Sequence, residues 1–501
     1  MDNNICLSFT KLIEYLKYRI FALNHLNGTM KFFKLILKTV LLIIVITISI
    51  IVFRAYNSLK LPDLKKWHTQ MPTPELLKNN EYSSFEEFVK ADEEYVRHNF
   101  ELIQSEDFDL FERYNPKSGN YPLKDGENYN ASFIMDPGSN AKGIVILFHG
   151  LSDSPYHMSD IAKHFYDENY YVFAMRLPGH GTLPTGLLDV QWSDWQNATI
   201  WSMKTASQLS KNRGDLPVYM GGFSTGGSMI VNYCLNAATT TELNMPDKVF
   251  LFSPAAGVSS LGYVGGWHHI LSWMDTFKKF AWLDILPEYD PAKYMSFTKN
   301  AGRQIFLLTK ENMELAAQLH KNQLMDKIPP FISFESWVDA TVIPKDLISY
   351  YDLIGNSDDE LIIFDVNKNY APFIKGNRSG ELADIVKNKK EYTFEILRNI
   401  PNDSIKNMAT IFSFNVASHE FETASTDTLY WPKNIYSISH ISVPISPSNN
   451  LYGKKSSLSN MLIVGEKNTL IIPSADITRV RYNPFFNFMM KRIDEFIKDK
   501  G

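Results

Sequence analysis

The chain has 501 residues, of which 45% are hydrophobic and 13% aromatic, and this is enough apolar material for a large globular core. Its formal net charge is −5 and it contains no basic block, which argues against nucleic acid as a partner. Cys6 and Cys234 are the only cysteines, and the sequence has no HExxH or CxxC spacing, so we expect neither a disulfide nor a metal or other cofactor.

A long apolar stretch lies near the N-terminus, at residues 32–54. Its core is interrupted only by Lys38 and is long enough to cross a bilayer as a helix. It is too long for a cleaved signal peptide, and no small-residue cleavage site follows, so we expect an uncleaved transmembrane anchor. A slight excess of basic residues before it predicts that residues 1–31 are a cytoplasmic extension and that the remainder is extracytoplasmic, or periplasmic in a bacterium. Residues 1–29 are either a short amphipathic extension or, since Met30 would be a natural start, residues that are not translated.

A polar linker is expected next, at residues 55–79. It is followed by SSFEEF at residues 83–88, where a serine N-cap and a glutamate three residues later form the pattern of a capping box. We therefore expect the soluble domain to start near residue 80 and to cover residues 80–501.

Two apolar, β-branched runs then end in glycine-containing loops. The first, at residues 141–150, ends in His149 and Gly150, and the second, at residues 170–181, ends in LPGHG. A helical stretch separates them from a third apolar run at residues 217–227. Strands that alternate with helices of about a dozen residues predict a parallel sheet with functional loops at the carboxyl ends of its strands.

The third run, PVYMGGFSTGG, places Ser224 between Gly222 and Gly226 directly after the strand. A sharp turn from strand to helix strains the serine backbone, and glycines two positions away on either side avoid a clash. The hydroxyl then lies at a helix N-terminus, where the dipole and free N–H groups favour developing negative charge. This pattern predicts a nucleophile elbow.

A further apolar strand is expected at residues 248–257, and the HG loop, LPGHG loop and GxSxGG elbow precede it in that order. With these motifs, residues 141–257 resemble the α/β-hydrolase superfamily, in particular its monoacylglycerol lipase and lysophospholipase branch. The resemblance implies an α/β fold, with a doubly wound, mostly parallel sheet and a helical cap insertion. It also implies a Ser, acid, His triad in chain order, and an oxyanion hole formed by the N–H groups of Leu151 and Thr225, with His149 shaping the loop.

The acid of such a triad must follow a strand after the cap. Asp339 lies in the turn after the apolar run at residues 328–336, where its carboxylate could accept the Nδ1 hydrogen of a histidine and set its tautomer. A turn-capping role is the alternative for this aspartate. Glu420 is the competing acid, but choosing it would roughly double the length of the segment before the acid strand.

The base must be a histidine after Asp339, which leaves His419 and His440. His440 is preferred because it ends a strand-like run and a Pro- and Ser-rich loop follows it, as is typical of loops that present catalytic residues. His419 also ends an apolar run and remains the alternative. A structural role as a satisfied polar group is open for either histidine.

Two insertions and a final helix complete the expected domain. A cap at about residues 259–328 is rich in aromatic residues, which suit an acyl chain but could equally bury against the main domain. An insertion at about residues 355–430 contains three strand-like runs that extend the sheet or form a flap. Apolar residues at helical spacing predict a closing helix from Phe485. The tryptophans of the cap are Trp267, Trp273 and Trp282.

These features predict a membrane-anchored serine hydrolase that cleaves carboxylic esters through an acyl-enzyme. The resemblance, the aromatic cap and the anchor favour a lipid-like substrate with an apolar acyl group, such as a monoacylglycerol or a lysophospholipid. The alternatives are a peptidase or acyltransferase of the same fold, and a non-catalytic binding protein in which the insertion has displaced the base.

Overall fold

The computed structural model describes residues 3–104, 108–257, 272, 274–337, 339, 341–366, 392–399, 408–415, 420–432, 435, 437–461 and 479–498. It contains two compact units. The first comprises Met1–Leu61 and Leu271–Phe280, and the second comprises Pro62–Ile270 and Ala281–Gly501.

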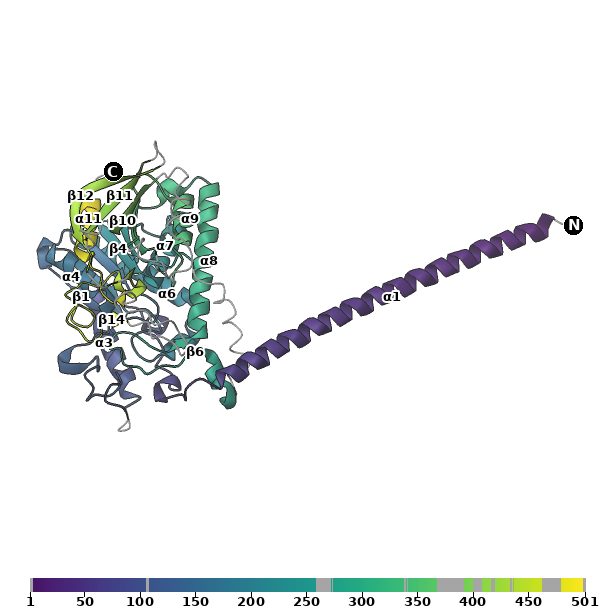
Figure 1. Ribbon diagram of the computed structural model, residues 1–501, viewed down its shortest axis with the longest axis horizontal. Helices are drawn as coiled ribbons and strands as arrows, with labels where there is room; N and C mark the ends of the chain where they lie inside the picture. Colours follow the sequence, from purple (N-terminus) through teal and green to yellow (C-terminus); the bar gives the residue numbers. More distant parts are fainter. Residues whose placement is uncertain are drawn as a thin grey trace. The chain divides into compact units, whose positions relative to one another are not determined.

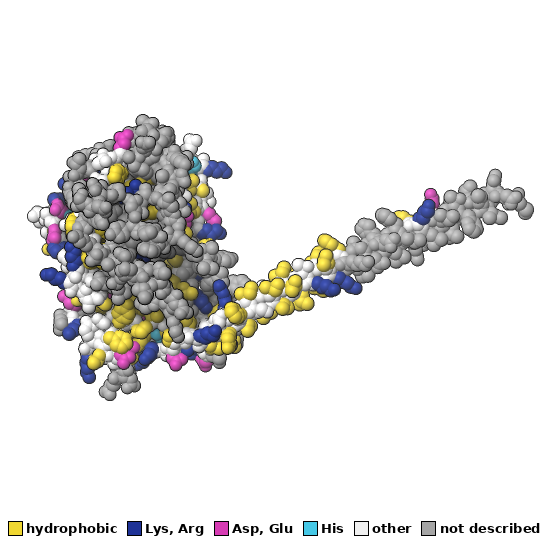
Figure 2. Space-filling view, in the orientation of Figure 1, with side chains coloured by type: hydrophobic (Ala, Val, Ile, Leu, Met, Phe, Trp, Pro, Cys, Tyr) yellow, Lys and Arg dark blue, Asp and Glu magenta, His cyan; other side chains and the backbone are white. Residues whose placement is uncertain are grey.

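The first unit is dominated by helix α1, Asn3–Ser58. Its segment Phe32–Ser58 has 27 residues and a mean hydropathy of 3.0, and none of its most apolar window is buried. Figure 2 shows hydrophobic side chains along this part of the helix. Length and composition qualify it to span a membrane, and a signal sequence would have the same properties. In the same unit, Lys279 donates a hydrogen bond to the carbonyl of Leu61 at 2.9 Å.

The second unit is built on a ten-stranded sheet in the order β1-β3-β2-β4-β5-β8-β9-β10-β11-β12. The strands from β3 to β10 in this order are parallel, whereas β1, β11 and β12 are antiparallel to their neighbours. The strands are β1 Phe133–Met135, β2 Ile144–Phe148, β3 Tyr171–Met175, β4 Val218–Phe223, β5 Lys248–Phe252, β8 Phe331–Ser336, β9 Glu360–Phe364, β10 Thr393–Asn399, β11 Met408–Asn415 and β12 Glu420–Tyr430.

Helices cover both faces of this sheet. In Figure 1, α7, α8 and α9 lie on one side of the sheet and α4 and α11 lie on the other. Every residue of β2, β3, β4 and β8 is buried, as expected of parallel strands covered on both faces. The main helices are α3 Phe85–Glu101, α4 Ser159–Asp167, α6 Trp192–Asn212, α7 Thr225–Ala237, α8 Lys299–Lys321, α9 Pro344–Ile354 and α11 Phe486–Lys498.

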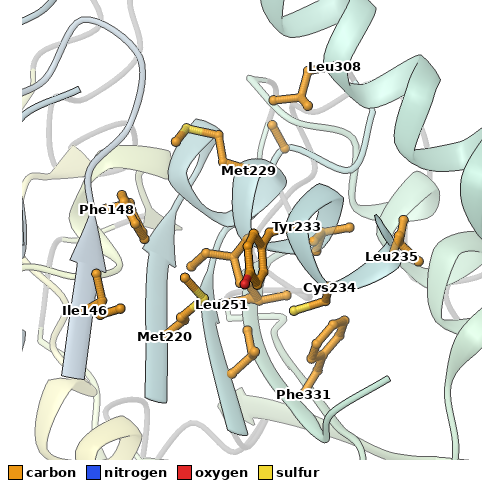
Figure 3. Close-up of a cluster of buried hydrophobic side chains, with 14 of the residues drawn as sticks. Ile146, Phe148, Met220, Met229, Tyr233, Cys234, Leu235, Leu251, Leu308 and Phe331 are labelled. Carbon is orange, nitrogen blue, oxygen red and sulfur yellow. The ribbon is translucent and has the colours of Figure 1, made fainter. Parts of the chain in front are cut away.

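Helix α7 forms the centre of the larger core cluster. Figure 3 shows Met229 and Tyr233 above the strands that carry Ile146, Met220 and Leu251. All these side chains are at most 1% exposed. The burial anchors α7 on the sheet, and it therefore holds the N-terminus of α7 in place at the end of β4.

The segment after Leu61 differs from the polar linker predicted for residues 55–79. Residues up to Ser58 continue helix α1, and the chain from Pro62 belongs to the second unit. Trp67 is only 1% exposed, and its ring centroid lies 5.1 Å from that of Tyr114. Burial of this large aromatic side chain stabilises the segment on the domain and outweighs its polar composition.

The insertion at residues 355–430 is predicted either to extend the sheet or to form a flap. The structure shows the first of these for strands β9, β10, β11 and β12. They extend the main sheet beyond β8, with β10 parallel to β9 and then two antiparallel strands. The chain then enters a small sheet formed by β13 Ser437–Ile438, β15 Arg479–Val480 and β14 Asn460–Met461. Strand β13 of this small sheet ends two residues before His440, and β14 and β15 follow His440 in the chain.

Candidate active site

Ser224 lies between β4 and α7 in a strained conformation, with φ 51° and ψ −113°. A Cβ atom at Gly222 would lie 2.5 Å from the backbone carbon of Gly226. A Cβ atom at Gly226 would lie 2.4 Å from the carbonyl oxygen of Phe148. Both positions therefore require glycine for a close approach of backbone to backbone, which is the steric arrangement that the sequence predicts for an elbow.

Replacing Gly226 by alanine is expected to lower the free energy of unfolding by about 3 kcal/mol, because the new methyl group meets backbone atoms that cannot rotate away. The matched control is Gly302→Ala in α8, where the new Cβ would meet only Phe297 at an ordinary 3.6 Å. The control should be neutral or stabilising by up to about 1 kcal/mol. Urea unfolding of the two variants measures the difference, and equal stability of both would contradict the proposed steric role.

Asp339 follows β8 in a tight turn and forms a hydrogen-bonded pair with His440. Its Oδ2 lies 2.6 Å from His440 Nδ1. Its Oδ1 accepts hydrogen bonds from the backbone N–H groups of Thr341 at 2.7 Å and Val342 at 3.3 Å. Burial by itself would raise the pKa of the Asp339 carboxyl, but the charge and hydrogen bond of His440 and the two amides lower that pKa below its ordinary value. The carboxylate is therefore ionised and oriented toward the imidazole.

His440 begins the short 3-10 helix His440–Ser442 and is 7% exposed. Its ring centroid lies 4.9 Å from that of Phe223, the residue before Ser224. The segment before it is tied to the end of β8, because Ser336 Oγ donates to the carbonyl of Ile438 at 3.2 Å. The fold thus brings the predicted base beside both the predicted acid and the elbow.

The HG loop after β2 approaches the elbow closely. A Cβ atom at Gly150 would lie 2.8 Å from the ring of Phe223 and 2.6 Å from Asp153 Oδ2. Among the described residues, the backbone N–H groups of Leu151 and Thr225 have no acceptor. Both predicted oxyanion-hole donors thus lack a backbone partner within the described part of the chain, which is compatible with their proposed role.

His149 connects the HG loop to the LPGHG loop. Its Nδ1 lies 2.8 Å from the carbonyl oxygen of Gly150, and its Nε2 accepts a hydrogen bond from the N–H of Leu177 at 3.1 Å. Burial, with the neighbouring His180, holds the pKa of His149 well below its ordinary value. A neutral imidazole that bridges two loops has the loop-shaping role that the resemblance implies.

A segment of the predicted cap contacts the HG loop, and the sequence motifs do not predict this contact. Tyr294 donates its N–H to the carbonyl of Ser152 at 2.8 Å, and Ser152 has a φ of 65°. Lys293 Nζ lies 2.5 Å from Asp153 Oδ1 and 2.9 Å from Ser152 Oγ. Burial opposes ionisation of Asp153, but His157 and Lys293 bring its pKa to about 2. In the sequence, this contact corresponds only to a lysine, Lys293, and an aspartate, Asp153, that lie far apart in the chain.

The remaining sequence predictions fall partly outside the described residues. His419, Trp267 and Trp273 lie outside them, and the side chain of Glu420 is not described although its backbone begins β12. Trp282 is 2% exposed and its ring contacts that of His68 at 4.9 Å, so it packs against the N-terminal segment of the domain. Within the described part of the chain, no group of three or more His, Cys, Asp or Glu residues is arranged to hold a metal ion.

Comparisons with known proteins agree with this fold. Residues 139–341 match the family model described as serine aminopeptidase, S33. This range contains the HG loop, the LPGHG loop, the elbow and Asp339. No curated protein matches the chain.

Several solved structures are similar to part of the chain. A structure titled for LipS and LipT, two metagenome-derived lipolytic enzymes, has 19% identity and a TM-score of 0.37, over 51% of this chain and 97% of that one. A soluble variant of monoglyceride lipase from Saccharomyces cerevisiae has 15% identity and a TM-score of 0.37, over 46% and 81% of the two chains. A monoacylglycerol lipase from Paleococcus ferrophilus has 17% identity and a TM-score of 0.33, over 46% and 87%.

The family model and the sheet order lead to the same conclusion. The parallel strands from β3 to β10, the glycine-flanked Ser224 after β4 and the acidic turn after β8 follow the order of an α/β-hydrolase sheet. Residues 139–341 therefore match the serine aminopeptidase S33 family model, and the domain that contains them has the α/β-hydrolase fold.

Proposed function

We propose that the protein is a serine hydrolase that cleaves carboxylic esters, with Ser224 as nucleophile, His440 as base and Asp339 as the acid that orients His440. The observation that carries the proposal is the 2.6 Å contact between Asp339 Oδ2 and His440 Nδ1, formed beside the strained elbow. Because Nδ1 faces the carboxylate, Nε2 is the nitrogen left to take a proton.

The reaction would proceed in two halves. Ser224 Oγ attacks the ester carbonyl carbon while His440 Nε2 takes the hydroxyl proton, and the N–H groups of Leu151 and Thr225 hold the oxyanion. The tetrahedral intermediate then expels the alcohol, which receives the proton from His440. Water attacks the acyl-enzyme with His440 again as base, and the carboxylic acid leaves as Ser224 regains its proton.

Three observations support a lipid-like ester as the substrate. The solved structures above are titled as lipolytic enzymes and monoglyceride lipases, the predicted cap is aromatic, and Phe32–Ser58 is long and apolar enough to cross a bilayer. We infer a lipid-like ester with an apolar acyl group, cleaved by a domain tethered to the membrane. The slight excess of basic residues before the helix favours an extracytoplasmic domain. The part of the expected cap at residues 281–328 belongs to the same compact unit as Ser224.

A peptidase is the second candidate, because the description of the matching family model is serine aminopeptidase. An acyltransferase would use the same acyl-enzyme with an alcohol in place of water. A non-catalytic binding protein would keep the fold without an activated serine. The family resemblance alone does not separate these activities, because one fold hosts many chemistries.

A fluorophosphonate probe tests the proposal without knowledge of the substrate. The full-length chain, purified in detergent, should be labelled at one serine, and Ser224→Ala should abolish the labelling. The same variant should lower the rate of ester hydrolysis by about 10³-fold or more. Short acyl esters and aminoacyl anilides should then be compared, with the esters expected to be the substrates.

Two results would contradict this assignment. Absence of labelling in a wild-type protein with a cooperative unfolding transition would favour the binding protein. Cleavage of aminoacyl anilides in preference to esters would favour the peptidase.

A further inference from the structure

Glu335 is an acidic residue in the middle of the buried sheet. It belongs to β8, Phe331–Ser336, where every residue is buried, and Glu335 itself is 0% exposed. Strands β5 and β9 flank β8 on its two sides. An ionised carboxylate in such a position requires a paired cation, or else the group becomes neutral.

The contacts of Glu335 supply no cation. Its Oε1 accepts hydrogen bonds from the N–H of Ser336 at 2.8 Å and from Ser253 Oγ at 3.2 Å. Its Oε2 is buried without a donor, and among the described residues no lysine, arginine or histidine forms an ion pair with this carboxyl. The turn after β8 brings Asp339 back to the end of the strand, with its N–H donating to the carbonyl of Ser336 at 3.0 Å, and the carboxyl that acts on Glu335 is that of Asp339.

Two carboxyl groups in contact in a dry environment cannot both be ionised, so one of them holds the proton. Asp339 has the better support for its charge, with His440 on Oδ2 and two backbone N–H groups on Oδ1. Burial and the negative charge of Asp339 raise the pKa of Glu335 well above its ordinary value, whereas the pKa of Asp339 is lowered. Burial and the lack of a paired cation among the described residues therefore favour the proton on Glu335.

We propose that Glu335 is a positioning residue, protonated at neutral pH, whose Oε2–H donates a hydrogen bond to the Asp339 carboxylate behind His440. The inference rests on the proposed function, since it extends the Ser224, His440 and Asp339 system by one member. Every contact then has a donor and an acceptor: Ser253 and Ser336 donate to Oε1, and Oε2–H donates to Asp339. The pair carries one negative charge.

This arrangement would tune the site in two ways. The hydrogen bond from Glu335 fixes the Asp339 carboxylate in the orientation that meets His440 Nδ1. It also reduces the negative charge that the Asp339 carboxylate presents to His440. The protonated imidazole of His440 is therefore stabilised less than it would be by a carboxylate without this hydrogen bond. The charged groups facing Glu335 are thus Asp339 directly and His440 through Asp339.

The substitutions Glu335→Gln and Glu335→Met separate these effects. Glutamine keeps an N–H donor for Asp339 and an acceptor for Ser253 and Ser336, so its kcat/KM should stay within about threefold of wild type, with the same acidic limb of the pH profile. Methionine has a similar size but no donor, so kcat should fall about tenfold with little change in KM. Its acidic limb should move to higher pH, because the full charge of Asp339 then stabilises protonated His440.

The opposite assignment, an ionised Glu335, predicts a different result. Glutamine would then remove a negative charge from the site, and the acidic limb would move to lower pH. That shift, or equal losses of kcat in the two variants, would overturn the proposal. Because the glutamine variant is isosteric, it keeps the test meaningful even if the methionine variant does not fold.

A readout independent of catalysis separates this inference from the proposed function. The infrared difference spectrum between wild type and Glu335→Gln at pH 7 should show the loss of one protonated carboxyl band. If that band is present but the wild type is neither labelled by the fluorophosphonate nor active, the proposed function fails while the protonation of Glu335 stands. If wild type is active and the band is absent, the inference about Glu335 fails alone.

Discussion

Replacing His440 by alanine is expected to lower kcat/KM for ester hydrolysis by about 10³-fold or more, because Ser224 then has no group to take its proton. The structure supports the choice of His440 as the base, because its Nδ1 lies 2.6 Å from Asp339 Oδ2 and its ring lies beside that of Phe223. Fluorophosphonate labelling should fall in parallel, because the probe reports the same activation of the serine.

The control for this prediction is His419→Ala, which should retain wild-type activity. Urea unfolding of both variants should show similar midpoints, so that loss of activity cannot be assigned to loss of fold. Equal residual activity in the two variants would remove His440 from the proposed mechanism. A selective loss in His419→Ala would move the role of base to that residue.

Replacing Asp339 by asparagine is expected to lower kcat by about 10³- to 10⁴-fold while KM changes little. The asparagine amide has nearly the same shape, but its NH₂ group cannot accept the Nδ1 hydrogen of His440. The imidazole would then adopt the other tautomer, with a hydrogen on Nε2, and could not act as base toward Ser224. The measurement is steady-state hydrolysis of an ester by the two proteins.

Stability should also report on Asp339. Because its pKa is lowered on folding, the ionised carboxylate contributes stability that is present above its unfolded pKa of about 4 and is lost as the pH falls through the folded pKa. The asparagine variant should lack this dependence. Glu420→Gln is the matched control, and it should be active with a wild-type stability profile. Full activity in Asp339→Asn, or a loss in Glu420→Gln, would contradict the assignment of the acid.

The local sequence could predict the elbow because the determinants of this feature are local. The glycines at positions 222 and 226 are required by backbone approaches within the turn itself and to the adjacent β2. The buried strands β2, β3, β4 and β5 were likewise predictable, because parallel strands covered on both faces need continuous apolar runs. Such signals remain readable from a single sequence.

The N-terminal segment shows where local signals fail. Residues 62–79 have a polar composition, which predicts a linker, yet Trp67 is buried there and Glu75 accepts a hydrogen bond from the N–H of Gly179 at 2.7 Å. Gly179, the partner of Glu75, lies 104 residues away in the chain. No periodicity in the sequence indicates a contact over such a separation. The burial of Trp67 and the hydrogen bond to the Glu75 carboxylate depend on the tertiary structure, so the composition of the segment does not predict them.

The sequence alone predicted the α/β-hydrolase fold, a candidate nucleophile and an apolar helix long enough for a membrane, because each prediction depends on residues that are neighbours in the chain. The tertiary structure decided that Asp339 meets His440 across 101 residues and that the insertion extends the sheet. These contacts arise from the order in which strands pair and from the dry environment that pairing creates. Neither is encoded in the spacing of residues along one segment.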